Sequence, residues 1–80
     1  MKLPVIKKLV ETYTLEELMA AELAISEGEK PAIEIEGEDE GEQLTHAYAA
    51  VTIRQEIELN GKDLKTALRE YTNRVRDSIS

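Results

Sequence analysis

Signals that begin a helix recur along this chain of 80 residues, and they constrain its fold more than any other feature. Thr14 and Glu17 have the spacing of a capping box, in which each side chain pairs with a backbone N–H at the start of a helix. Asp39 and Glu42 have the related Asp-x-x-Glu spacing. Pro4 suits a first helical turn, where its missing N–H needs no partner. The sequence therefore predicts helices that begin near these three points.

Two stop signals complete the pattern. Gly28 can adopt the left-handed conformation that ends a helix, and Asn60-Gly61 is a second stop, after which a fourth helix begins. We therefore expect an all-α fold of four helices in a single domain over residues 1–80, with a short first helix. The predicted helices run from Pro4 to about Thr12, from the Thr14 cap to about Glu27, from Glu40 to about Leu59, and from Lys62 or Asp63 to Ser78.

Between the second and third helices the period of the apolar residues changes. Pro31 breaks the helical pattern, and Ala32-Ile33-Glu34-Ile35-Glu36 alternates apolar and polar residues with a period of two. This pattern is typical of a half-buried β-strand, but a lone strand leaves its backbone groups unpaired. Three alternatives are open. The segment pairs with the N-terminal residues, it pairs with a second copy of the chain, or it is an extended linker.

The chain is short for independent stability. A domain of this size buries about 60% of the surface that its unfolded chain exposes, and no cysteine is present to form a disulfide. The third predicted helix is apolar on two faces, which is typical of a central helix. We therefore predict a homodimer with this helix near its interface. The two faces are formed by Leu44, Ala47, Tyr48 and Val51 and by Ala50, Ile53 and Ile57.

Negative charge is concentrated in the middle of the chain. Residues 27–42, the acidic segment, hold eight carboxylates and one lysine, whereas the rest of the chain is neutral, so this segment carries the whole formal charge of −7. The charge argues against nucleic acid, which binds basic surfaces, and favours a protein partner. The candidate partner-binding residues are Glu34, Glu36, Glu38, Asp39 and Glu40.

The fourth predicted helix separates its apolar and basic residues. The basic stripe is either an ordinary solvated face or a surface that meets the acidic segment, within one chain or across a dimer. Exposed ion pairs each add only ~0–1 kcal/mol, so such pairs would orient the segment without holding the fold together. The apolar stripe holds Leu64, Ala67, Leu68, Tyr71, Val75 and Ile79, and the basic stripe holds Lys62, Lys65, Arg69 and Arg76.

Three further residues are candidates for a subunit interface or a pocket. Glu22 lies within the apolar stripe of the second helix, where a carboxylate must reach solvent, pair with a base or be protonated. His46 is the only histidine, and the alternative to a catalytic role is a histidine bonded to the backbone or to water. Tyr48 lies on the third helix. No cysteine and no recognisable serine nucleophile accompanies them, so we expect neither an enzyme nor a cofactor.

A calcium site has only partial support. Glu36, Glu38, Glu40 and Gly41 match positions one, three, five and six of an EF-hand loop, but position twelve is Ala47 instead of a bidentate glutamate. No tuned metal site is predicted, and weak binding of divalent cations by the acidic segment is kept as an alternative.

The two ends of the chain resemble a known family. Met1-Lys2-Leu3-Pro4-Val5-Ile6-Lys7 is similar to the opening of an uncharacterised family of short bacterial proteins, a domain of unknown function. The closing stretch Ala67–Ile79 resembles the Ala-Leu, aromatic, Arg-Val and Ser-Ile pattern of the same family. The resemblance implies a small, mostly helical, intracellular protein, and it carries no functional residues over.

These observations favour a non-catalytic cytoplasmic protein, an accessory or interaction protein that acts as a homodimer. Nothing resembles a signal peptide, and no stretch is long and apolar enough to span a bilayer, so no membrane association is expected. The alternative is a small enzyme or ligand-binding protein whose site forms between subunits.

Overall fold

The computed structural model describes residues 2–79, with side chains through Asp77, and contains four α-helices and no strand in this part of the chain. Each helix agrees with its predicted bounds to within one or two residues, so the all-α prediction is confirmed. The side chain of Ile79, predicted to continue the apolar stripe of the last helix, lies outside the described side chains. The helices are α1 (Leu3–Thr12), α2 (Leu15–Ser26), α3 (Glu40–Asn60) and α4 (Leu64–Ile79).

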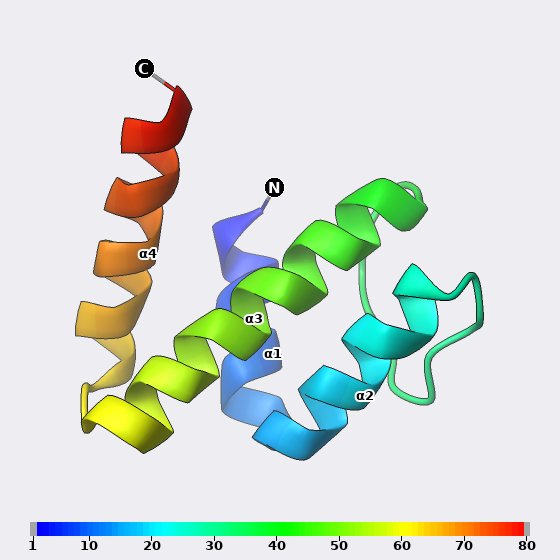
Figure 1. Cartoon of the computed structure of the whole chain (residues 1–80), viewed down its shortest axis with the longest axis horizontal. Coiled ribbons are helices and arrows are strands. Elements are labelled where there is room, and N and C mark those ends of the chain that lie inside the picture. Colours follow the sequence, from blue (N-terminus) through cyan, green and yellow to red (C-terminus); the bar gives the residue numbers. More distant parts are fainter. Residues whose placement is uncertain (1, 80) are drawn as a thin grey trace.

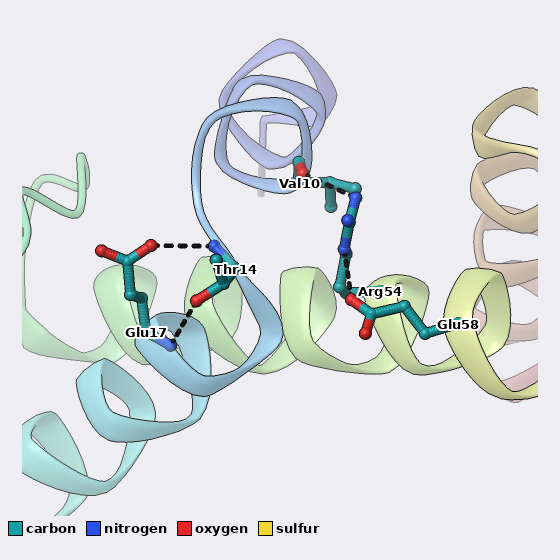
Figure 2. Close-up of polar contacts among 5 residues, drawn as sticks. All are labelled: Val10, Thr14, Glu17, Arg54 and Glu58. Atoms are coloured by element: carbon teal, nitrogen blue, oxygen red, sulfur yellow. Dashed lines mark hydrogen bonds and ion pairs between the residues drawn. The ribbon is translucent and has the colours of Figure 1, made fainter.

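Both predicted caps are present at the starts of α2 and α3. The Thr14 hydroxyl accepts a hydrogen bond from the Glu17 N–H at 3.1 Å, and the Glu17 carboxylate accepts one from the Thr14 N–H at 2.9 Å (Figure 2). The Asp39 carboxylate accepts from the Glu42 N–H at 2.8 Å. Glu42 departs from the capping-box pattern, because its carboxylate accepts from the N–H of Glu38, one residue before the cap, at 2.9 Å.

The stops also act as the sequence predicts. Gly28 has a φ of 79°, and the next residue, Glu29, donates its N–H to the carbonyl of Ala24 at 2.8 Å, a shorter bond than the 3.2 Å one that this carbonyl accepts from the Glu27 N–H. Gly61 ends α3 with a φ of 67°. Both conformations are ones that side chains with a Cβ rarely adopt.

Helix α3 is the centre of the molecule. It packs against α1, α2 and α4, and Figure 1 shows it passing in front of α1 with α2 and α4 on opposite sides. Ala47, Ala49 and Ala50 are fully buried, and their small side chains let the neighbouring helices approach closely. The prediction that the third helix is central is confirmed. The other buried apolar residues are Ile6, Leu9, Val10, Leu18, Ala21, Ile25, Ile35, Val51, Ile53, Ala67 and Tyr71.

A side chain of α3 also satisfies the end of α1. The guanidinium of Arg54 donates to the Val10 carbonyl at 3.3 Å and to the Glu58 carboxylate at 2.6 Å (Figure 2). The carbonyls of a last helical turn have no partner within the helix. Arg54 therefore joins α1 to α3 at a point where α1 needs a donor.

The stretch between α2 and α3 is extended but does not form a strand among the described residues. Its alternation is nevertheless reflected in burial, because Ile35 is buried and Ile33 packs against the core, whereas Glu34 and Glu36 are exposed. Gly37 lies so close to α3 that a Cβ added there would be 2.7 Å from a side-chain carbon of Gln43. Of the alternatives left open by the sequence, the structure of the single chain corresponds to the extended linker.

Candidate functional site

Two carbonyls of the extended stretch are bonded by side chains of α3 instead of by another strand. The Gln43 side-chain amide donates to the Ile35 carbonyl at 3.1 Å. The His46 Nδ1 lies 2.7 Å from the Glu36 carbonyl oxygen. These two contacts provide partners for two of the backbone carbonyls of this lone extended segment.

His46 is fully buried and joins three parts of the chain. Besides its contact with Glu36, its Nε2 accepts a hydrogen bond from the Lys2 N–H at 2.9 Å. Only a neutral ring with its proton on Nδ1 makes both bonds, because the charged ring has a donor at each nitrogen. Both nitrogens are therefore occupied by backbone groups, and the ring connects the chain start, the acidic segment and α3.

Three other candidates from the third helix lie in or against the core. Ala50 and Ile53 are fully buried within a single chain, and Ile57 is partly buried against the same cluster. Their side chains are therefore covered by the other helices of the same molecule.

The five candidate partner-binding residues of the acidic segment are all exposed. Asp39 also caps α3, and the Glu38 carboxylate lies 4.0 Å from the Lys2 ammonium. The backbone hydrogen bond from Glu38 is the largest of the effects that lower the pKa of Glu42. Glu34, Glu36 and Glu40 are the three carboxylates of the five that face solvent without a capping contact or salt bridge among the described residues.

Glu22 and Tyr48 meet at a groove between α2 and α3. The groove has a volume of about 430 Å³ and is lined by Glu22, Leu23, Ser26, Leu44, Thr45 and Tyr48. Glu22 is half-buried at its edge, whereas Tyr48 is 56% exposed and Leu23 is 59% exposed. A second, larger hollow of about 630 Å³ lies along the extended stretch, where Lys30, Glu34 and Glu40 are among its lining residues.

Sequence reasoning missed the exposure of two α2 residues, Leu23, which lines this groove, and Met19, which does not. Met19 is 46% exposed and lies one turn before Leu23. The residues of α2 that are buried are Leu18, Ala21 and Ile25, so the inward face is rotated away from Met19. The helical spacing of Leu18, Ala21 and Ile25 is the sequence signal that would have identified the buried face of α2.

The basic stripe of α4 does not meet the acidic segment within one molecule. Lys62 pairs with Glu70 at 2.6 Å and with Glu56 at 3.0 Å, and these carboxylates raise the pKa of Lys62. Figure 1 shows α4 and the acidic segment on opposite sides of the molecule. Lys62 itself precedes the first residue of α4. The other three residues of the predicted basic stripe lie on α4, are exposed and form no salt bridge within the described part of the chain. They are Lys65, Arg69 and Arg76.

Two negative findings concern the described residues alone. Among them, no three side chains of His, Cys, Asp or Glu are grouped so that they could hold a metal ion. None of the helices is long and apolar enough to cross a membrane.

Comparison with known proteins agrees with the resemblance seen at the two ends of the chain. One family model matches residues 1–80. The chain belongs to DUF6952, a family of unknown function. No curated protein and no solved structure matches the chain significantly. Because membership of DUF6952 brings no assigned activity, function has to be argued from the surface described above.

Proposed function

We propose that this chain is a non-catalytic cytoplasmic accessory protein that works as a homodimer and binds a protein partner through its acidic segment. The observation that carries the proposal is the apolar patch beside the groove between α2 and α3, formed by Met19, Leu23 and Tyr48. Each of these side chains is about half exposed. Scattered exposed apolar residues are normal, but neighbouring ones rimmed by polar groups mark interaction surfaces.

The buried polar chemistry supports a role without catalysis. His46 is the one buried polar or charged residue among those described, and both of its ring nitrogens are bonded to backbone groups. A general acid or base needs an atom that is free to exchange a proton with the substrate. Glu22 and Tyr48 share a groove that is open to solvent, and the Ser26 and Thr45 hydroxyls that also line it donate to backbone carbonyls instead of to a carboxylate or other base that could activate them.

Dimer formation is tested by sedimentation equilibrium over a wide concentration range. We expect the mean mass to rise towards that of a dimer, and Leu23→Gln to weaken this association without changing the charge. Leu3→Gln is the matched control, because Leu3 is also an exposed apolar residue, at 37%, but does not line the groove. A mass that stays that of the monomer at every concentration contradicts the homodimer.

Partner binding by the acidic segment is tested separately. The double variant Glu34→Gln, Glu36→Gln removes two exposed charges and leaves the Asp39 cap intact. We expect it to lose a protein that the wild type captures from its native cells. The control carries the same change at Glu11 and Glu16, which are exposed on α1 and α2. Equal capture by the two double variants would count against a role for the acidic segment.

A further inference from the structure

One row of residues along the outward face of α3 carries no charge, although 34% of the chain is charged. Its members are separated alternately by four and by three residues, which is the spacing of a seam between two packed helices. Absence of charge is also typical of the centre of an interface. All six residues are exposed or half-buried, with Tyr48 at 56% and Leu59 at 75%. The row, called the α3 seam below, is Gly41, Thr45, Tyr48, Thr52, Gln55 and Leu59.

The two threonines of the α3 seam are already hydrogen-bonded within the helix. The Thr45 hydroxyl donates to the Gly41 carbonyl at 2.9 Å, and the Thr52 hydroxyl donates to the Tyr48 carbonyl at 3.0 Å. Burial of a hydroxyl is unfavourable chiefly when it loses its hydrogen bond to water. Because these donors keep their partners in a dry contact, the seam can be covered without that penalty.

We infer that the α3 seam packs antiparallel against the same seam of a second copy. The inference rests on the proposed homodimer and specifies its interface. The spacing of the seam is symmetric about residue 50, so an antiparallel pair brings each member opposite another member. Gly41 then faces the partner's Leu59, Thr45 faces the partner's Gln55, and Tyr48 faces the partner's Thr52. A large side chain meets a smaller one at the two ends and at the centre, as close packing requires.

The seam is continuous with the surface proposed above. Thr45 and Tyr48 belong both to the seam and to the groove between α2 and α3. A second copy on the seam therefore also reaches the edge of the apolar patch at Tyr48. The contact would cover the exposed aromatic ring together with the adjoining groove.

Charge selects the antiparallel orientation over the parallel one. The acidic segment leads into the first turn of α3, and α4 follows its last turn. Parallel seams would place two segments of strong negative charge side by side. Antiparallel seams separate them by the length of α3, about 30 Å for 21 residues, which is well beyond the ~8 Å screening length at physiological salt. They also bring each acidic segment to the end of the dimer where the partner carries the basic residues of α4.

Disulfide trapping tests the register, because the chain has no cysteine of its own. Two single variants, Thr45→Cys and Gln55→Cys, are mixed at concentrations where the wild type is dimeric and are then oxidised. We expect the mixed disulfide to dominate, since these positions face each other in the antiparallel pair. Two Thr45 positions lie ten residues apart along the axis, about 15 Å, which is too far for a disulfide. In a parallel pair they would face each other.

A charge placed in the seam tests the same contact by affinity. Thr52→Glu is expected to weaken dimer formation by at least ~10-fold, because a carboxylate buried at an interface lacks a counter-charge there. Thr66→Glu, on the exposed side of α4, is the control, and circular dichroism of both variants verifies that the helices are intact.

The outcomes separate this inference from the proposed function. A wild type that is monomeric throughout overturns both. A wild-type dimer that traps Thr45→Cys with itself, or that is unaffected by Thr52→Glu, overturns the antiparallel seam and leaves the homodimer standing. The seam is supported if the mixed disulfide dominates and if Thr52→Glu weakens dimer formation whereas Thr66→Glu does not.

Discussion

Replacement of His46 by alanine tests whether the acidic segment is held by this ring. The variant loses the hydrogen bonds to Lys2 and Glu36, each contributing about 1 kcal/mol. It also leaves a cavity where a fully buried side chain stood. Both backbone groups are only partly buried and regain some hydration, so we expect a total loss of about 3 kcal/mol. For 80 residues the free energy of unfolding is about 4–12 kcal/mol, so this is a large share.

Urea unfolding followed by circular dichroism measures this loss as a lower midpoint at an unchanged slope. Gln43→Ala is the matched control, because it removes a single hydrogen bond to the same extended stretch, from a half-buried side chain. We expect that variant to lose about 1 kcal/mol. If His46→Ala destabilises the protein no more than Gln43→Ala does, the ring does not hold the segment and the reasoning is refuted.

Three further predictions concern local features of the fold. Thr14→Ala should lower the free energy of unfolding by about 1 kcal/mol through loss of the α2 cap, and Thr14→Ser should restore it, both measured by urea unfolding. Gly37→Ala should lower it by about 1–3 kcal/mol, because the new methyl group would overlap Gln43, and a melting temperature equal to that of the wild type would contradict this. The hydrogen bond to the Glu70 carboxylate is the largest cause of the raised pKa of Lys62, so the folded protein holds the Lys62 proton more tightly than the unfolded chain does. The charged lysine therefore stabilises the fold below the usual lysine pKa, and this stabilisation is lost as the pH rises above that range. Between about pH 8 and about pH 11.5, the urea midpoint of the wild type should therefore fall more than that of Lys62→Met. Equal falls would argue against stabilisation of the fold by the charged Lys62.

The helices could be predicted because their signals are local. The cap formed by Thr14 and Glu17 depends on atoms three residues apart, and the stop at Gly28 depends on the backbone preference of one residue. Such signals act regardless of how the helices later pack. The same locality explains why the predicted bounds are close to those of the structure.

The partners of the extended stretch could not be predicted, since they lie on another element. Ile35 is bonded by a side chain eight residues ahead, and Glu36 by one ten residues ahead. Which side chains of α3 face the stretch depends on the angle at which the chain returns after Gly37. Period-two alternation reports burial on one side of a segment, and a neighbouring helix can provide that burial as well as a sheet can.

The exposure of Tyr48 likewise depends on packing between helices. The sequence places it on an apolar face with Ala47 and Val51, which are both buried. In the structure α2 covers one side of α3 and α4 the other, and the ring of Tyr48 is left outside. Amphipathic periodicity defines the centre of a buried face but not its edge, and Tyr48 lies at that edge.

The bonding of the extended stretch also bears on how two copies can associate. An exposed extended segment with free backbone groups is a template for strand addition by another chain. Here the carbonyls of Ile35 and Glu36 are already taken by side chains of α3. The exposed carboxylates of Glu34 and Glu36 would face like charges on an added copy of the same segment. Both features disfavour strand pairing between copies, so a homodimer of this chain is expected to form through its helical surfaces.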